Sequence, residues 1–237
     1  MATPQAAGPG GNLKLFSGNS TRAVFAELFP EFERVTGIRV TPDYDPAQVV
    51  LKRVATGETA DLAILGQAAI DALAGKGMIV PESRRTLARC GVGIGVRAGA
   101  PKPDVSSAEA FKRALLDAKS IAHTSEGASG IHFSGVVQRL GIADIVRAKA
   151  VTNPGGLIGE LVVAGKADLA IQQIPELMAV PGIDLVGPLP QEFQNISVLT
   201  AGIFAGSRQA VAAQALLEFL AAPAAARVFR AKGLEPA

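Results

Sequence analysis

The 237-residue chain contains no tryptophan, one tyrosine and one cysteine, and each scarcity excludes a class of protein. With Cys90 alone, neither an intramolecular disulfide nor a multi-cysteine metal site can form. With so few large aromatic side chains, a stacking platform for bases or sugar rings would depend on the ten phenylalanines, which mostly recur at helix-core spacing. These absences argue against a lectin and against a protein that binds single-stranded nucleic acid.

Charge and long apolar runs are also scarce. Charged residues make up 19% of the chain and balance to a net charge of +2 without a basic cluster, so no nucleic-acid partner is expected. The chain contains no run of eighteen apolar residues, so no membrane span is predicted. Residues 1–11 lack the basic and apolar segments of a secretion signal and are predicted to form a flexible leader. The protein is then periplasmic if a signal peptide has been removed, and cytoplasmic if the gene is truly leaderless.

The most informative feature present is a repeat. The pattern Ala-Asp-Leu-Ala-Ile occurs at 60–64 and again at 167–171, each time after an amphipathic helix pattern and a glycine, Gly57 or Gly165. Each copy reads as a helix, a turn and a short apolar strand that ends in a polar step. The duplication predicts an α/β protein with two similar β-α-β lobes that face one cleft, which favours ligand capture over chemistry.

Strand and helix patterns alternate through both lobes. Predicted strands lie at 13–16, 38–41, 60–64, 120–123, 149–152 and 167–171, and predicted helices at 24–32, 49–54, 68–74, 108–118, 127–140, 157–164, 209–220 and 224–231. Pro30 predicts a kink or a split in the first helix. The extended runs 90–96 and 195–204 are predicted to cross between the lobes and to act as the hinge. Lobe 1 then comprises 12–93 plus 198–237, and lobe 2 comprises 94–197.

Four predicted helices begin just after strand ends, at 17–21, 44–47, 125–130 and 153–156. Helix N-termini present free amide donors and a partial positive charge, and ligands of open α/β sheets lie at the carboxyl ends of strands. The candidate ligand-binding residues are Ser17, Gly18, Asn19, Ser20, Tyr44, Pro46, Ala47, Gln67, Ser129, Gly130, Asn153, Gln172 and Gln173. Helix capping by the first serines, a solvated strand end at the two glutamines and simple packing of the tyrosine remain alternatives.

No set of residues predicts catalysis. Asp61 and Asp168 form a matched pair, but each precedes a strand at the end opposite the cleft, which favours turn or capping roles. His123 and His132 are interpreted as structural, and Cys90 as a small buried apolar residue. The sequence has no Gly-x-Ser-x-Gly elbow, no phosphate-binding loop and no paired histidines at metal spacing. We therefore expect no catalytic residues, no metal, no cofactor and no enzymatic activity.

Four stretches resemble the molybdate-binding branch of the type II periplasmic solute-binding proteins: residues 15–20, 57–64, 129–141 and 219–233, within a similarity that spans nearly all of 12–234. The resemblance implies a Venus-flytrap protein that captures a small, usually anionic solute and delivers it to the permease of an ABC transporter. It also implies a monomer that contacts the membrane only through that permease.

The resemblance transfers unevenly to individual positions. Ser20 matches the first-loop serine of molybdate binders, and Ser129 matches the amide donor of their third loop. Pro46 and Ala47 stand where the family has a serine, and Gln173 stands where it has a tyrosine.

The nearby carboxylates of Asp43 and Asp45 would repel a compact dianion by about 1 to 4 kcal/mol each at 4 Å. We therefore expect a polar or carboxylate-bearing organic ligand rather than molybdate. Two alternatives stay open. One is a cytoplasmic effector-sensing domain of the same fold, and the other is an enzyme on this scaffold, which turnover of a bound compound would reveal.

Overall fold

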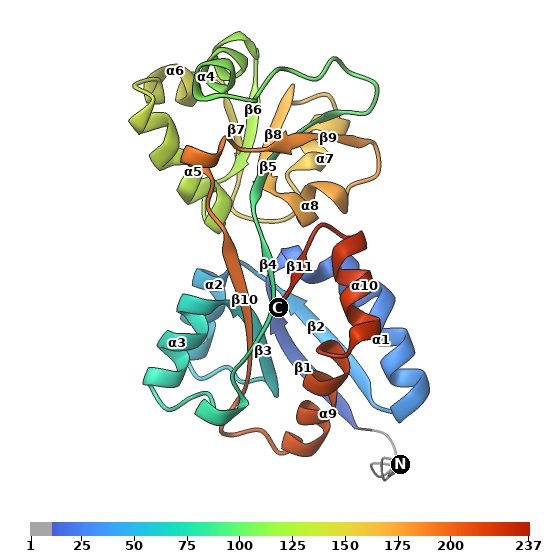
Figure 1. The fold of residues 1–237 in the computed structure, drawn as a ribbon. Coiled ribbons are helices and arrows are strands. Elements are labelled where there is room, and N and C mark those ends of the chain that lie inside the picture. The colour runs from blue at the N-terminus through green and yellow to red at the C-terminus, as the bar shows by residue number, and fades with distance from the viewer. Residues whose placement is uncertain (1–10) are drawn as a thin grey trace. The chain divides into compact units, whose positions relative to one another are not determined.

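The computed structural model describes residues 11–237 and divides them into two compact units (Figure 1). Unit 1 contains the chain up to Ala88 together with Val198–Ala231 and Glu235–Ala237, and unit 2 contains Arg89–Ser197 with Lys232–Leu234. Apart from Gly11, the predicted leader lies outside the described residues. Both units are α/β, as the sequence predicts.

Unit 1 is built on a six-stranded sheet in the order β11-β4-β10-β3-β1-β2. The strands are β1 (Asn12–Ser17), β2 (Arg39–Tyr44), β3 (Leu62–Gly66), β4 (Arg85–Cys90), β10 (Ser197–Ile203) and β11 (Glu235–Pro236). Strands β2 and β3 run parallel to β1, and β10 runs antiparallel to β3. Alternate residues of the apolar strands point to opposite faces, so the sheet needs cover on both sides.

Helices supply that cover in unit 1. They are α1 (Arg22–Thr36), α2 (Ala47–Ala55), α3 (Gln67–Gly75), α9 (Ala210–Leu220) and α10 (Pro223–Ala231), with short 3₁₀ turns at Asn19–Thr21 and Pro81–Ser83. Figure 1 shows α2 and α3 on one face and α1, α9 and α10 on the other. Phe16 packs with Val50, Val54 and Ile70 on the α2–α3 side.

Helix α1 continues through Pro30, so the predicted split does not occur. Pro30 and Ala26, whose carbonyl loses its helical partner, are both exposed. Water can therefore satisfy the carbonyl, and the buried face of the helix is unaffected. The helix ends at Gly37, whose φ of 71° is the left-handed conformation that favours glycine.

Unit 2 is built on a five-stranded sheet in the order β7-β6-β8-β5-β9. The strands are β5 (Val92–Arg97), β6 (Ile121–Thr124), β7 (Ala150–Asn153), β8 (Leu169–Gln173) and β9 (Ile183–Pro188). Strands β7 and β8 run parallel to β6, whereas β5 runs antiparallel to both β8 and β9. The helices are α4 (Ala108–Asp117), α5 (Ala128–Arg139), α6 (Ala143–Ala148), α7 (Gly159–Val163) and α8 (Ile174–Met178), with a 3₁₀ turn at Gln191–Phe193.

The helices of unit 2 also form two layers. Phe111 of α4, Phe133 of α5 and Val146 of α6 pack with strand residues in one core, and Val162 of α7 and Leu177 of α8 belong to the other. Unit 2 is therefore a sheet between two helical layers, the arrangement that buries apolar parallel strands.

The two aspartates of the repeat occupy equivalent positions in their units. Asp61 accepts the backbone N–H of Lys14 at 2.9 Å and donates its own N–H to the Lys14 carbonyl at 2.8 Å. Asp168 accepts the N–H groups of Lys119 and Ser120 at 2.8 and 3.3 Å and donates its N–H to the Ser120 carbonyl at 3.1 Å. Each carboxylate ties the starts of two neighbouring strands together, which agrees with the predicted turn role.

The predicted crossing strand at 90–96 is two strands rather than one. Strand β4 belongs to the sheet of unit 1 and β5 to the sheet of unit 2, with Gly91 between them. The alternating glycines do permit close approach, but to a helix of unit 2: a Cβ atom at Gly93 would lie 2.8 Å from the Ile174 side chain, and one at Gly95 would lie 3.2 Å from Leu177. Both contacts are made by α8.

The structure also contains strands that sequence periodicity missed. Strand β9 runs through the proline-punctuated region and pairs at the edge of its sheet, where Pro188 can end a strand without loss of a ladder bond. Strand β11 is only two residues long.

No single helix among residues 11–237 is long and apolar enough to cross a membrane. Taken together, helices α9 and α10 have the length and apolar composition of a membrane span, but they are bent by 66° relative to each other. Leu216, Leu217 and Phe229 of this pair are buried in unit 1, which accounts for its apolar composition.

Candidate functional site

The candidate residues of unit 1 lie at one edge of its sheet. Ser17 at the end of β1 is in register with Tyr44 at the end of β2 and with Ile64 of β3. The remaining candidates follow these strand ends: Gly18, Asn19 and Ser20 precede α1, Pro46 and Ala47 begin α2, and Gln67 begins α3. The structure therefore brings all the candidates of unit 1 to the carboxyl ends of parallel strands.

Two hydroxyls of the first loop are occupied in holding it. Ser17 Oγ lies 3.2 Å from the Ile64 carbonyl and 2.8 Å from Thr21 Oγ1, and Thr21 donates to the Gly18 carbonyl at 2.9 Å. Ser20 is 4% exposed, and its hydroxyl makes no hydrogen bond within the described chain. Ser20 therefore offers a free donor at a fixed position.

The helices that begin at these edges lack side-chain caps. Within the part of the chain that the structure describes, no side chain accepts a first-turn N–H of α1, α2 or α3, nor of α5 in unit 2. In contrast, Ser107 caps α4 by accepting the N–H of Ala110 at 3.2 Å. The interpretation of the first-loop serines as helix caps is therefore wrong. Uncapped first-turn amides are suited to bind an anion.

The carboxylates beside the second loop are neutralised by an arginine. Arg53 of α2 forms ion pairs with Asp43 and Asp45 and a 2.7 Å ion pair with Glu58. Its guanidinium also lies over the Phe16 ring at 4.8 Å. Hydrogen bonds from Arg53 and then Lys14 lower the pKa of Glu58 to about 2. The predicted repulsion of a dianion by Asp43 and Asp45 is therefore overestimated, because Arg53 compensates their charge.

Tyr44 is held by a second arginine. The Arg22 guanidinium lies 4.3 Å from the centre of the Tyr44 ring and donates to Asn19 Oδ1 at 3.1 Å. Burial raises the pKa of Tyr44 to about 12, so its hydroxyl stays protonated at neutral pH. Both residues line a cavity of about 450 Å³ between α1 and β2. Arg22 was not among the candidates, although its position directly after the first loop was a usable signal.

The candidates of unit 2 lie at the equivalent edge of the second sheet. Thr124 at the end of β6 is in register with Asn153 at the end of β7, and β8 lies on the other side of β6 and ends at Gln172 and Gln173. Ser129 and Gly130 are buried in the first turn of α5, whereas Asn153 is exposed. The structure brings these residues to the carboxyl ends of β6, β7 and β8.

Thr124 is a polar residue at this edge that the sequence analysis missed. The residue is 3% exposed, and its hydroxyl has no hydrogen-bond partner within the described residues. A Cβ atom at Gly127 would overlap that hydroxyl, and one at Gly130 would overlap the Thr124 carbonyl. The two glycines thus let the first turn of α5 approach Thr124 closely. The strand-end position of Thr124, directly before the loop, could have identified it.

The side-chain amides of both glutamines at the end of β8 are already engaged. Gln172 accepts the N–H of Ile158 at 2.9 Å and donates to the Gly156 carbonyl at 2.7 Å. Gln173 donates to Ser197 Oγ at 2.9 Å. Gln172 therefore fixes the loop that leads into α7.

A buried carboxyl group lies beside these glutamines. Glu176 of α8 is 8% exposed, and burial raises its pKa to about 8, although the Gln173 N–H and the Gln172 side chain act in the opposite direction. Burial, followed by the charge of Glu176, raises the pKa of Cys90 to about 12, so Cys90 remains a thiol. Sequence reasoning did not identify Glu176, because no helix was predicted around it and the burial of its side chain depends on tertiary packing.

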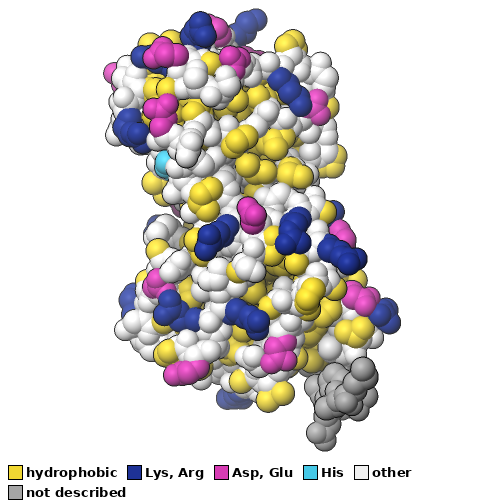
Figure 2. Space-filling view, viewed as in Figure 1, with side chains coloured by type: hydrophobic (Ala, Val, Ile, Leu, Met, Phe, Trp, Pro, Cys, Tyr) yellow, Lys and Arg dark blue, Asp and Glu magenta, His cyan; other side chains and the backbone are white. Residues whose placement is uncertain are grey.

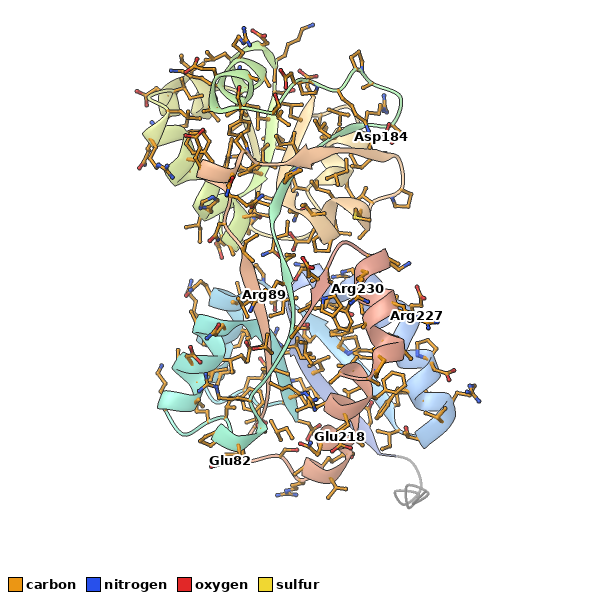
Figure 3. The ribbon with its side chains drawn as sticks, in the orientation of Figure 1. Glu82, Arg89, Asp184, Glu218, Arg227 and Arg230 are labelled. Carbon is orange, nitrogen blue, oxygen red and sulfur yellow. The ribbon has the colours of Figure 1, made fainter. Side chains whose placement is uncertain are left out.

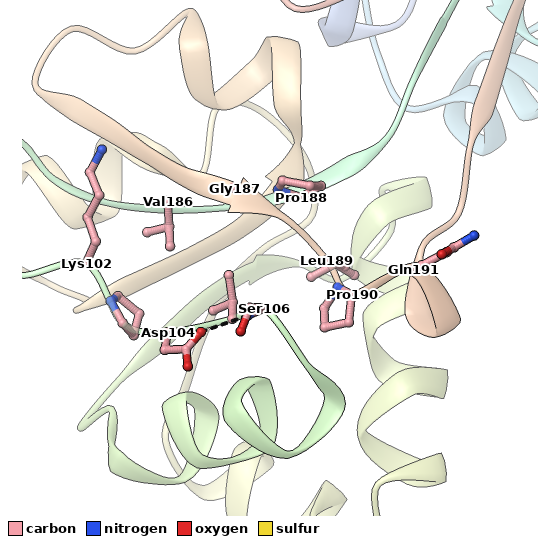
Figure 4. Close-up of a pocket in the computed structure, with 11 residues that line it drawn as sticks. Lys102, Asp104, Ser106, Val186, Gly187, Pro188, Leu189, Pro190 and Gln191 are labelled. Atoms are coloured by element: carbon pink, nitrogen blue, oxygen red, sulfur yellow. Dashed lines mark hydrogen bonds between the residues drawn. The ribbon is translucent and has the colours of Figure 1, made fainter.

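Unit 2 also has a surface cavity away from these strand ends. A cavity of about 460 Å³ lies between residues 102–106 and 186–191 (Figure 4). Two of its charged side chains are engaged: Asp104 accepts the N–H of Ser106 at 2.9 Å, and Lys102 donates to the Leu185 carbonyl at 3.0 Å. Within residues 11–237, no group of three or more His, Cys, Asp or Glu side chains could hold a metal ion.

Charged side chains are spread over both units. Figure 2 shows basic and acidic side chains interspersed on the visible face of each unit. The arginines Arg227 and Arg230 of α10, labelled in Figure 3, are both exposed. A buried ionisable residue such as Glu176 is therefore unusual in this protein.

Comparison with known proteins identifies the family to which the chain is similar. The model of the bacterial extracellular solute-binding proteins matches residues 13–235. The periplasmic molybdate-binding protein of Azotobacter vinelandii has a TM-score of 0.79 at 19% identity and covers 94% of this chain and 98% of its own. PEB3 with bound L-phospholactate has a TM-score of 0.68 at 15% identity and covers 94% of this chain and 99% of its own. The resemblance to the molybdate-binding branch and the predicted fold are confirmed.

One relative changes the functional interpretation. A Pseudomonas protein named aconitate isomerase is 35% identical over 237 residues, which covers 98% of this chain and 90% of that protein. A homologue that is an enzyme overturns the prediction that this chain has no enzymatic activity. That prediction was wrong because it required a known catalytic motif or a matched pair of carboxylates, whereas an isomerase can require only one group that moves a proton.

Proposed function

This chain belongs to the bacterial extracellular solute-binding proteins, and we propose that it is an isomerase which binds a small organic polycarboxylate such as aconitate. The observation that carries the proposal is the 35% identity to a protein named aconitate isomerase, which extends over 98% of the chain. Similarity of this extent includes both units and both strand edges.

The proposed binding groups are amides and hydroxyls at the carboxyl ends of the strands. In unit 1 they are Ser20 and the uncapped first turns of α1 and α2. In unit 2 they are Thr124 and Ser129 with the uncapped first turn of α5. Hydrogen bonds to charged groups contribute about 1.5–3 kcal/mol each. Three or four such bonds would correspond to micromolar binding, about −8 kcal/mol.

The chemistry follows from the structure of aconitate, a propene with a carboxylate on each carbon. Removal of a proton from the CH₂ group leaves an electron pair that spreads over three carbons and is stabilised by the carboxylates. Return of the proton to the former vinyl carbon moves the double bond and can exchange cis and trans geometry. No atom is gained or lost, so the reaction needs one proton-transfer group and no oxidant or reductant.

Solute capture for an ABC transporter is the second candidate function. The family match and the fold shared with a periplasmic molybdate-binding protein favour it. Both functions fit a location outside the cytoplasm, and in transport the membrane contact would be made through a permease. They differ in one measurable respect, since capture returns the ligand unchanged.

Proton NMR of cis-aconitate and of trans-aconitate incubated with the purified protein tests the proposal. We expect either isomer to reach the same equilibrium mixture at a rate proportional to protein concentration. The matched control is the same protein with citrate, which has no double bond to move and must remain unchanged. Calorimetric binding of aconitate without interconversion would leave solute capture as the function. If the protein neither binds nor interconverts aconitate, the polycarboxylate site is rejected.

A further inference from the structure

The position of Glu176 connects it to the strand edge of unit 2. The residue lies in α8, which begins directly after Gln173 at the end of β8. The Gln172 side chain acts on the Glu176 carboxyl and also binds Gly156 and Ile158 in the loop before α7. Glu176 is therefore part of one polar cluster with the loop that follows β7.

The charged side chains on the strands that pack against α8 bind groups other than the Glu176 carboxyl. Helix α8 packs on β5, whose Arg97 donates to the Val163 carbonyl, and on β9, whose Asp184 (labelled in Figure 3) accepts the N–H of Gly99 at 3.1 Å. Cys90 is the titratable neighbour from β4. Gly233 packs against α8, and its neighbour Lys232 is the cation of that segment. Burial is the largest influence on the Glu176 pKa.

The other titratable groups near these edges either have a raised pKa or are held by a partner. Tyr44 and Cys90 have pKa values of about 12. Asp43 and Asp45 are paired with Arg53. His132 Nε2 lies 2.7 Å from the Phe193 carbonyl and is held by it. Glu176 differs from all of these, since its carboxyl exchanges its proton near pH 8.

We propose that Glu176 is the group that removes the proton from one allylic carbon of the substrate and returns it to the other. The inference rests on the proposed isomerase function. In its carboxylate form Glu176 takes the proton as a C–H bond breaks and an O–H bond forms. The electron pair moves into the carbon skeleton, the double bond shifts, and the same carboxyl then gives the proton to the opposite carbon. Glu176 ends as the carboxylate with which it began.

The substitution Glu176→Gln separates this role from helix capping. Glutamine has the size of glutamate and can accept the Gln173 N–H as a cap, but it cannot take a proton from carbon. We expect kcat for aconitate to fall at least about 100-fold, the lower bound for loss of general acid–base catalysis, with KM within about threefold. Glu160→Gln, at an exposed first-turn glutamate of α7, is the matched control and should leave both constants unchanged.

The pH profile provides a readout that a structural role would not change. In the wild type, kcat/KM should rise about tenfold per pH unit below about pH 8 and level off above it, as the carboxylate forms. The residual activity of Glu176→Gln should lack this rise. If Glu176→Gln does not fold, Glu176→Asp, which withdraws the carboxyl by one methylene, must lower kcat with little change in KM.

The outcomes separate the two proposals. A wild-type protein that does not interconvert the aconitates refutes the isomerase function. An active wild type whose Glu176→Gln variant keeps its kcat and its pH profile refutes the role of Glu176 alone. A folded Glu176→Asp variant with unchanged kcat would refute that role equally.

Discussion

Gly130, in the first turn of α5, packs against the backbone carbonyl of Thr124 with no room for a Cβ atom between them. The contact places the amides of this turn beside the buried Thr124 hydroxyl, which has no partner within the described residues. Close approach, rather than a special backbone conformation, is why glycine is required here, since Gly130 does not adopt a positive φ.

Gly130→Ala should therefore destabilise the protein, because its Cβ would displace β6 from α5. We expect the free energy of unfolding to fall by about 1–3 kcal/mol, as for overpacking of a filled interior. Gly135→Ala, in the same helix with open space around the added Cβ, is the matched control and should stabilise by about 0.5–1 kcal/mol. Urea unfolding measures both, and equal stability of the two variants would contradict the packing argument.

The ion-pair cluster around Arg53 supports a second prediction. Arg53→Leu leaves Asp43, Asp45 and Glu58 without their shared cation. Because these carboxylates are partly exposed, the variant should unfold only about 1 kcal/mol more easily. It should also bind anions more weakly, because the two aspartates beside the second loop are unmasked. Higher salt should reduce both effects by screening the carboxylates.

Arg34→Leu is the control for this substitution, since Arg34 pairs with Glu31 on an exposed helical surface. Its loss should change stability little, because solvent screens an exposed pair, and should leave anion binding unchanged. Chemical unfolding and calorimetry at two salt concentrations provide the comparison. Equal losses in the two variants would show that Arg53 has no special role.

The free hydroxyls predict effects of opposite sign on binding and stability. Thr124→Val removes a buried hydroxyl without a partner, whose burial costs about 1–3 kcal/mol, so the variant should be more stable. If the hydroxyl binds the ligand, the same variant should lose about tenfold in aconitate affinity, the equivalent of about 1.4 kcal/mol.

Ser20→Ala should lose about tenfold in affinity for the same reason, with stability almost unchanged because the hydroxyl has no internal partner. Ser17→Ala is the contrasting control: it removes hydrogen bonds that hold the first loop and should lower stability. Thermal unfolding and calorimetry distinguish the three variants. A less stable Thr124→Val variant would show that the hydroxyl is satisfied in the folded protein.

The raised pKa of Glu176 makes stability depend on pH. The folded protein holds this proton up to about pH 8, whereas the unfolded chain releases it near 4.5. Between these values the folded state binds more protons, so the stability contributed by Glu176 is complete below pH 4.5 and is lost as pH rises through 8.

Glu176→Gln should remove this dependence of stability on pH. Relative to that of the wild type, the melting temperature of the variant should therefore increase from pH 5 to pH 8.5. The difference isolates Glu176, because the two proteins are identical at every other position. Parallel melting curves across this range would contradict a buried, protonated Glu176.

Several features could be predicted from the sequence because they depend on local patterns. The duplicated Ala-Asp-Leu-Ala-Ile segments predicted two α/β units, and Asp61 and Asp168 tie strand starts as expected. The candidate residues do gather at strand ends within each unit, because parallel strands followed by helices place their carboxyl ends at one edge. Their contact with a ligand and the hinge closure remain predictions.

Tertiary structure alone decided which polar groups are free. The sequence does not reveal that Arg53 neutralises Asp43 and Asp45 or that Gln172 is occupied by Gly156 and Ile158. Nor does it reveal that the Thr124 hydroxyl lacks a partner among residues 11–237. It also cannot indicate the raised pKa of Glu176. Hydrogen-bond partners and desolvation depend on which distant segments pack together, whereas periodicity and repeats depend only on neighbours along the chain.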